Sequence, residues 1–292
     1  MVTLVRRTVG GITYYYLEHS LRKNGRAAKK SRYLGRKIPK DIEEIKKQFA
    51  DELDKEKWFN KFDAIKRNYA TELARTPKTA RKKQLEDFSI TFTYDTQRIE
   101  GSTLSLRETA RLLDKGISPS GKPLVDAKEA ESHQRVFFEV LRYQKGLSLQ
   151  SVLYWHKKLF EDTKPDIAGQ IRRHGVKIAG IRFIPPSPVE LQPFLREFFS
   201  WHERSRTNMH PVELAALVHL KFVTIHPFSD GNGRISRLTM NFILKKHGYP
   251  MLNIEYKGRQ AYYNALERSQ INNRERTFCQ WFFRQYLKQN PP

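Results

Sequence analysis

Residues 226–237 constrain this chain more than any other segment, because they place a short polar loop between two stretches of helical character. Residues 211–225 are apolar nearly all round, which predicts a buried helix. Pro211 suits the first helical position, and the helix should end before Pro227, since the residue before a proline avoids helical dihedrals. A second helix is expected over residues 233–247. The chain therefore presents a loop that ends at a helix N-terminus.

This loop has the composition of an anion-binding site. Backbone amides and the helix dipole favour an anion at a helix N-terminus. Gly231 and Gly233 allow positive φ and close approach of the backbone to phosphate, and Asn232 offers a side-chain donor. We expect these residues to form an anion nest.

The charged residues of the loop add the groups needed for phosphoryl chemistry. Arg234 and Arg237 lie three apart on the first helical turn, and guanidinium forks match phosphate oxygens. Asp230 is an oxygen ligand of the kind that Mg²⁺ uses beside nucleotide phosphates, and His226 can take a proton from a hydroxyl at neutral pH. Each residue alone has an ordinary structural explanation, but all of them in this order favour a nucleotide site.

The loop resembles the HPFx[D/E]GNGRxxR signature of Fic-domain proteins, with every defining position filled. The resemblance implies that His226 deprotonates a target hydroxyl and that Asp230 holds Mg²⁺ between the α- and β-phosphates of ATP. It further implies that the amides of residues 231–233 form the anion hole, while Arg234 and Arg237 hold the β- and γ-phosphates. The implied reaction transfers AMP from ATP to Ser, Thr or Tyr of a target protein.

Two further segments extend the resemblance to about residues 88–287. Residues 167–186 look like the Fic flap, and their β-prone stretches predict a small hairpin that accepts a target backbone by strand addition. An ordinary structural hairpin is the alternative. The flap residues expected to contact the nucleotide are Val176, Lys177, Ile178 and Ala179.

Paired tyrosines near the C-terminus resemble those that line the adenine site in some Fic proteins. Tyr262 and Tyr263 are the residues concerned, since an aromatic ring can stack on a base. Packing against the core is the alternative for such a pair on a helix. Gln270, about two helical turns later, is a further candidate for contact with the nucleotide.

Residues 96–101 resemble the inhibitory motif [S/T]xxxE[G/N] of Fic proteins, with Thr96 and Glu100 at its defining positions. The resemblance implies that Glu100 pairs with Arg237 and blocks seating of the γ-phosphate. Glu100 could instead position a hydrolytic water for removal of AMP, and a plain helix-end glutamate is the structural alternative. Ser105 and Glu108 form a capping-box pattern that opens the next helix.

The net charge of +23 is concentrated in the first part of the chain. Residues 1–85 hold 23 Lys and Arg against 10 Asp and Glu, and residues 21–40 hold nine basic side chains and no acid. Such a block fits a polyanion such as nucleic acid, and a solvated basic face is the equal alternative. The single cysteine, Cys279, and the absence of a long apolar run favour a soluble, cytoplasmic protein without a membrane segment.

The N-terminal pattern predicts a basic hairpin followed by helices. Residues 12–17 and 31–34 are β-prone around the turn signal Asn24-Gly25, and residues 41–75 have helical periodicity that breaks near residues 56–57. Residues 76–83 are interpreted as a linker or turn. Further helices are expected at about residues 104–114, 126–144, 148–161, 188–204, 211–225, 233–247 and 259–287.

These patterns predict a mainly α protein: a Fic helical core with a small β-hairpin flap, preceded by a basic hairpin and helical appendage. The expected domains are residues 1–85 and 86–292. The leading interpretation is a self-inhibited adenylyltransferase that uses ATP and Mg²⁺. One alternative is a nucleic-acid-binding regulator that acts through the basic segment, and another is transfer of a different phosphate-containing group. The unaltered Gly231-Asn232-Gly233 sequence favours nucleotide transfer, and a homo-oligomer is compatible with the sequence.

Overall fold

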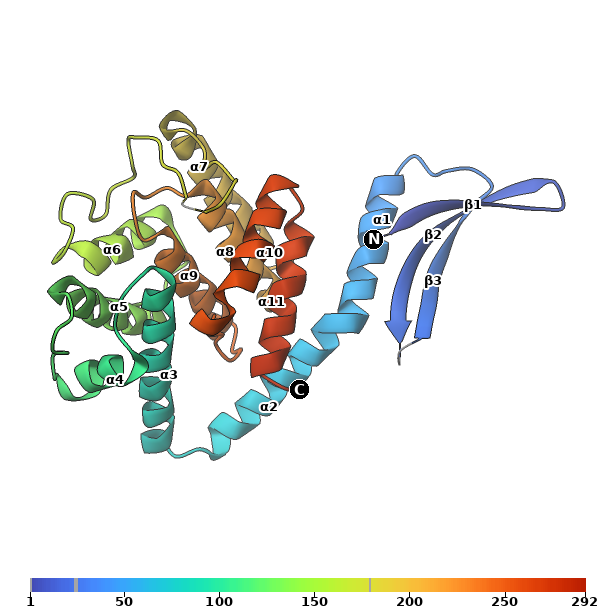
Figure 1. The fold of residues 1–292 in the computed structure, drawn as a ribbon. Coiled ribbons are helices and arrows are strands. Elements are labelled where there is room, and N and C mark those ends of the chain that lie inside the picture. Colours follow the sequence, from blue (N-terminus) through green and yellow to red (C-terminus); the bar gives the residue numbers. More distant parts are fainter. Residues whose placement is uncertain (1, 24–25, 179) are drawn as a thin grey trace. The chain divides into compact units, whose positions relative to one another are not determined.

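The computed structural model describes residues 2–23, 26–178 and 180–292, with only the backbone described for residues 21–23, 26, 27, 51, 54 and 55. The chain is mainly helical and contains one three-stranded antiparallel sheet (Figure 1). It divides into two compact units, Met1–Asp63 and Ala64–Pro292. The boundary expected after residue 85 falls inside a helix of the second unit.

The first unit begins with the sheet, whose strands β1 (Thr3–Val9), β2 (Ile12–Lys23) and β3 (Arg26–Gly35) pair in the order β1-β2-β3. Gly10 and Gly11 connect β1 to β2 with φ angles of 55° and 77°, the left-handed pair that a tight hairpin turn needs. This glycine pair was the signal for β1, which the sequence analysis missed. The predicted Asn24-Gly25 turn lies outside the described residues, and β2 and β3 pair on either side of it.

Helix α1 (Ile42–Asp54) covers one face of the sheet. Leu17, Phe49 and Leu53 form the buried core of this unit, with Val2, Leu34, Ile42 and Ile45 packed around them. The predicted break near residues 56–57 is a π-helical turn, η1 (Lys55–Phe59), after which α2 (Asn60–Arg75) continues. The helical path is therefore locally widened at this point rather than interrupted.

The predicted linker at residues 76–83 is wrong for most of its length. Only Thr76 and Pro77 lie outside helices, because α3 (Lys78–Ile99) begins directly after them. Pro77 occupies the N-cap position, and the Lys, Arg and Ala residues that follow are good helix formers. The basic residues after Pro77 therefore belong to a helix and not to a linker.

The second unit is a helical bundle with α8 (Pro211–Ile225) and α9 (Asn232–Lys246) at its centre (Figure 1). Both helices are buried along almost their whole length, as the apolar pattern of α8 predicts. The helices around them are α4 (Leu106–Lys115), α5 (Leu124–Arg142), α6 (Leu149–Phe160), α7 (Pro188–Ser205), α10 (Arg259–Ile271) and α11 (Glu275–Gln289), with a short 3₁₀ turn at Tyr256–Gly258.

Two expectations for this unit need correction. The single helix expected over residues 259–287 is two helices, because Asn273 adopts a left-handed φ of 49° that ends α10. The flap is not a hairpin: the described residues between α6 and α7 contain no strand, and a turn bond from Ile181 N to Ile178 O (3.3 Å) is the local order there. Within the described ranges, no helix has both the length and the apolarity needed to cross a bilayer.

Candidate active site

His226 ends α8 in a conformation that turns the chain sharply. Its φ of 52° and ψ of 55° are left-handed, which is uncommon for a residue with a side chain. The amide of His226 still donates to Phe222 O (3.1 Å), so the turn follows directly from the last helical bond. The imidazole is thereby presented at the C-terminus of a buried helix.

The partner of the His226 ring defines its tautomer. Nδ1 lies 3.2 Å from Val223 O, and since a carbonyl only accepts, Nδ1 carries the proton. Nε2 is then unprotonated and able to accept a proton. Burial lowers the pKa of His226, while the Val223 carbonyl opposes this shift. The side chain therefore has the properties of a general base at neutral pH.

Arg172 holds the backbone of this turn, a role that the sequence analysis did not assign. Its Nε donates to His226 O (2.8 Å), and its amide donates to Pro227 O (3.0 Å). Its other guanidinium nitrogens donate to His174 O (2.8 Å) and Pro186 O (2.6 Å), and the stretch that these two residues bound is called the flap segment below. Arg172 is 3% exposed, so one buried guanidinium fastens both ends of the flap to the histidine turn.

The glycines of the loop are required by the space around them. Gly231 has a φ of 83°, and a Cβ there would overlap the ring of Phe160. Asn232, predicted as a side-chain donor to phosphate, here bonds to the backbone of the loop. Its Oδ1 accepts from Phe228 N (2.9 Å) and its Nδ2 donates to Phe228 O (2.8 Å), so its buried amide closes the loop on itself.

Asp230 is surrounded by cations. Its Oδ2 accepts from Lys164 Nζ (2.6 Å), and its Oδ1 accepts from Arg234 Nη2 (2.7 Å) and from the amide of Gly231 (2.5 Å). Burial opposes the charge of this carboxylate, but Arg234 and Lys164 hold the pKa of Asp230 well below its usual range. Asp230 is therefore an anion throughout the physiological pH range.

His156 fixes the backbone of Asp230 from below the loop. Its Nδ1 accepts from the amide of Gly169 (2.9 Å), which leaves Nε2 to donate to Asp230 O (3.0 Å). The ring stacks on Phe228, with centroids 3.7 Å apart. Burial lowers the pKa of His156 to about 4, so this contact is made by a neutral imidazole.

A magnesium ion would rest mainly on Asp230. Among the residues that the structure describes, no cluster of three or more His, Cys, Asp and Glu side chains could hold a metal. One carboxylate nevertheless suffices for Mg²⁺ when nucleotide phosphates and water supply the other ligands. The side chain of Asp230 is 34% exposed, so its carboxylate can reach a magnesium ion once the Lys164 ammonium moves aside.

The two loop arginines are buried and already paired with acids. Arg234 is 2% exposed and pairs with Glu129 as well as Asp230, and Glu129 also forms an ion pair with Lys164 (Nζ to Oε1, 2.8 Å). Neither Glu129 nor Lys164 was predicted as part of the site. Lys164 and Arg234 thus each lie between the same two carboxylates, those of Glu129 and Asp230, and the four charges form a closed ring.

Arg237 is paired with Glu100. Its Nη2 donates to Glu100 Oε1 (2.5 Å), and its Nε lies 3.3 Å from Thr96 Oγ1. Glu100 is the C-cap of α3, so its side chain reaches Arg237 from the end of that helix. A Cβ on Gly233 would overlap Glu100 Oε1, which makes glycine a condition for this close approach.

The tyrosine pair does not form an open stacking surface. Tyr262 is 1% exposed, and its hydroxyl lies 3.5 Å from Arg237 Nη1 and 3.1 Å from His219 Nε2. Tyr263 is partly buried and donates to Ile99 O (2.9 Å), next to Glu100. The pair thus supports Arg237 and the end of α3, because this side of α10 faces the core.

Two cavities that share lining residues adjoin the end of α8. The larger, of about 1100 Å³, is lined by Val176 and Lys177 of the flap segment and by Thr224, Ile225 and Gln270. Ile178 is not among its lining residues, and Ala179 lies outside the described residues.

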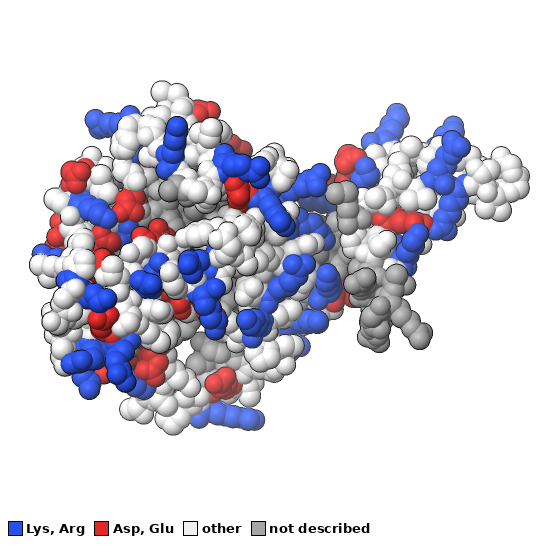
Figure 2. Space-filling view, in the orientation of Figure 1, with Lys and Arg blue, Asp and Glu red and all other residues white. Residues whose placement is uncertain are grey.

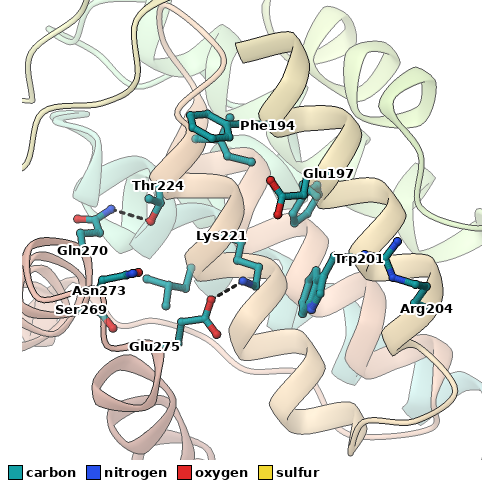
Figure 3. Close-up of a pocket in the computed structure, with 13 residues that line it drawn as sticks. Phe194, Glu197, Trp201, Arg204, Lys221, Thr224, Ser269, Gln270, Asn273 and Glu275 are labelled. Carbon is teal, nitrogen blue, oxygen red and sulfur yellow. Dashed lines mark hydrogen bonds and ion pairs between the residues drawn. The ribbon is translucent and has the colours of Figure 1, made fainter. Parts of the chain in front are cut away.

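The smaller cavity, of about 290 Å³, shares Thr224, Ile225 and Gln270 and continues between α7, α8 and the start of α11. Figure 3 shows Gln270 bonded to Thr224 (3.1 Å) on one side of it. Farther along it, Lys221 pairs with Glu275, and the Lys221 Nζ lies 4.8 Å from the ring centroid of Trp201 (Figure 3). Both cavities reach the end of α8 at Thr224 and Ile225, and neither includes His226 among its lining residues.

The chain is similar to known proteins of one family. Residues 146–244 match the model of the Fic/DOC family. Two relatives are each described as "Protein adenylyltransferase Fic": that of Aedes aegypti is 32% identical over 225 residues, 75% of this chain and 44% of its own length. That of Drosophila ananassae is 34% identical over 178 residues, 60% of this chain and 35% of its own length.

Solved structures show the same fold. A Fic-domain-containing signalling protein from Bacteroides thetaiotaomicron has a TM-score of 0.71 at 25% identity, covering 78% of this chain and 92% of that one. Fic-1 from C. elegans has a TM-score of 0.70 at 24% identity, covering 85% of this chain and 73% of that one. The chain is a Fic-domain protein, and it spans less than half the length of the curated relatives it matches.

Proposed function

We propose that this protein is a protein adenylyltransferase, which transfers AMP from ATP to a Ser, Thr or Tyr hydroxyl of a target protein. The observation that carries the proposal is His226, a neutral base with Nε2 unprotonated, at the edge of a glycine loop that starts a helix. The adenylyltransferase names of the relatives support the same reaction.

In the proposed reaction, His226 Nε2 removes the proton from the target hydroxyl as its oxygen attacks the α-phosphorus. The bond between the α-phosphorus and the bridging oxygen breaks, and pyrophosphate leaves. The amides at the start of α9 stabilise the developing charge. Mg²⁺, when bound at Asp230, would neutralise charge on the phosphates. Arg234 and Arg237 would bind the β- and γ-phosphates after leaving their carboxylate partners.

We further propose that Glu100 inhibits the enzyme. Its Oε1 accepts a hydrogen bond from Arg237 Nη2 (2.5 Å), and the γ-phosphate needs the same guanidinium. The same position would allow Glu100 to orient water for removal of AMP, as an additional activity of this site. The target is proposed to dock on the flap segment, which borders the larger cavity through Val176 and Lys177.

Incubation with α-³²P-ATP and Mg²⁺ tests both proposals. Wild type should label protein weakly, and Glu100→Gly should label it roughly 10-fold more strongly, since a charge-assisted hydrogen bond contributes about 1.5–3 kcal/mol. His226→Ala in the Glu100→Gly background should label roughly 10²–10⁴-fold less. Glu161→Gly is the matched control, because Glu161 also caps the end of a helix, α6, and should leave labelling unchanged.

Each outcome addresses a separate part of the proposal. Labelling that survives His226→Ala would exclude the assigned base. If Glu100→Gly labels protein no more strongly than wild type does, Glu100 is an ordinary helix-end residue and not an inhibitor. Label from γ-³²P-ATP in place of α-³²P-ATP would show transfer of a different phosphate-containing group.

Beyond ATP and the target protein, we consider a polyanion and a second copy of the chain as partners. We propose a polyanion as ligand of the basic N-terminal segment, which is also the basis for the alternative function as a nucleic-acid-binding regulator. The cytoplasmic location and a homo-oligomer remain predictions, which fractionation of cells and sedimentation of the purified chain would test.

A further inference from the structure

The two faces of the N-terminal sheet differ in what covers them. Residues opposite one another on neighbouring strands share a face, so Leu4, Leu17 and Arg32 share one and Val5, Tyr16 and Tyr33 the other. The first face packs on α1, where Leu17 is fully buried. The second face, called the tyrosine face below, carries Tyr33 with 55% of its surface exposed.

Three aromatic rings cluster on the tyrosine face. The ring centroids of Tyr16 and Tyr33 are 5.3 Å apart, and those of Tyr14 and Tyr33 are 6.2 Å apart. A hydrophobic core does not require this cluster, because the core of this unit lies on the opposite face. Aromatic rings on an exposed sheet surface are suited to stack on flat ligands such as unpaired bases.

Basic groups border the rings. The guanidinium of Arg7 lies 4.6 Å from the centroid of Tyr16, and that of Arg36 lies 5.9 Å from the centroid of Tyr14. The acid on this face, Glu18, is 7% exposed and is paired with Arg7 and with Lys29 (3.5 Å). The exposed charge beside the rings is therefore positive.

The segment that contains the sheet, residues 1–40, is also strongly basic. Residues 1–40 contain 11 Lys and Arg and one acid, Glu18. Figure 2 shows Lys and Arg side chains over the surface of this part of the chain. Cations bind a phosphate backbone and rings bind exposed bases, and an unpaired strand presents both together. A duplex keeps its bases stacked internally and would use only the cations.

We propose that the tyrosine face binds single-stranded nucleic acid. Bases stack on Tyr33 and Tyr14, and Arg7, Arg36 and Lys29 bind the phosphates between them. This narrows the proposed polyanion ligand to one class, and it does not depend on adenylyl transfer, since no nucleotide triphosphate takes part in the binding.

Fluorescence anisotropy of the full-length chain with a labelled oligouridylate, without ATP, tests the proposal. Wild type should bind the single strand more tightly than a duplex of equal length. Tyr33→Ala should weaken binding roughly 10-fold, as expected for loss of one stacked base, and Tyr33→Phe should retain it. Arg36→Ala should also weaken binding and reduce its dependence on salt.

Tyr154→Ala is the matched control, because Tyr154 of α6 is a similarly exposed tyrosine (49%) on the other unit and should not affect binding. Circular dichroism tests whether each variant keeps its fold, and Arg36→Ala provides the loss-of-binding test if Tyr33→Ala does not fold. No binding at low salt would overturn the proposal. So would preferred binding of the duplex, or single-strand binding that Tyr33→Ala leaves unchanged in a folded protein.

Discussion

The loop residues of this Fic domain are held by partners that neutralise them. Arg234 lies between Glu129 and Asp230, Arg237 binds Glu100, and Lys164 binds both Glu129 and Asp230. A buried charge is stable only when it is paired, so each phosphate or metal ion that binds here must replace an existing partner. The affinity of this site for a ligand therefore depends on how strongly Glu129, Glu100 and Lys164 hold the loop residues that the ligand would bind.

Lys164 is the clearest case for a prediction at this scale. Its ammonium lies 2.6 Å from Asp230 Oδ2, at the position that we propose for a divalent cation. Lys164→Met should therefore tighten binding of Mn²⁺ in the presence of ATP by roughly 10-fold, the scale of one charge-assisted contact. Electron paramagnetic resonance of free Mn²⁺ measures this without catalysis.

Lys158→Met serves as control for the Lys164 variant, because Lys158 lies near the end of α6, shortly before Lys164 in the chain, but pairs with Glu161 (2.8 Å) instead of Asp230. Its Mn²⁺ affinity should equal that of wild type. Weaker Mn²⁺ binding by Lys164→Met would mean that the lysine orients Asp230 for the metal instead of competing with it.

At the scale of elements, short local patterns determined where several helices begin. Ser105 and Glu108 form the capping box at the start of α4 that the sequence predicted: Glu108 Oε2 accepts from Ser105 N (2.8 Å), and Ser105 Oγ accepts from Glu108 N (3.3 Å). This box follows Glu100 closely along the chain, so it helps to fix the segment that ends α3.

Ser105→Ala should reduce the free energy of unfolding by about 1 kcal/mol, because the first turn of α4 loses its cap. Urea unfolding followed by tryptophan fluorescence measures this change. Ser200→Ala, at an exposed position inside α7, is the control and should be neutral or slightly stabilising, since alanine is the better helix former. Equal stability of Ser105→Ala and wild type would show that the box is not needed.

At the scale of the whole molecule, the second unit buries three histidines without exposing any of their surface: His133, His156 and His219. Burial lowers the pKa of His133 from 6.5 to about 3 and that of His156 to about 4, and it lowers the pKa of His219 well below 6.5. The folded protein therefore keeps all three rings neutral in mildly acidic solution.

These histidines predict acid sensitivity. Below a pH of 6.5 the unfolded chain binds protons at these residues that the folded chain cannot bind, so the free energy of unfolding should fall as pH falls toward about 4. The slope approaches about 1.4 kcal/mol per pH unit for each histidine. Urea unfolding across this pH range measures it.

His219→Gln should reduce the slope of unfolding free energy against pH by up to about 1.4 kcal/mol per pH unit, because one histidine fewer takes up a proton on unfolding. His174→Gln is the control, because His174 is exposed and should leave the slope unchanged. Stability that stays constant between about pH 6.5 and pH 4.5 would contradict the argument.

The sequence by itself determined the features that depend on neighbours along the chain. The apolar run before Pro227 predicted the buried α8, the glycines predicted the turn into α9, and the capping box predicted the start of α4. The family motif likewise located the loop and Glu100. These features are local, because dihedral preferences and the spacing of side chains on one helix determine them.

Only the tertiary structure decided which residues from distant segments complete the site. Arg172, Lys164 and Glu129 reach the loop from segments 54 to 105 residues away, and no spacing rule relates them to it. The flap is a loop fastened by Arg172, and Tyr262 is buried against Arg237. Burial and charge pairing depend on how the helices pack, because packing determines which carboxylate meets which guanidinium in a region that excludes water.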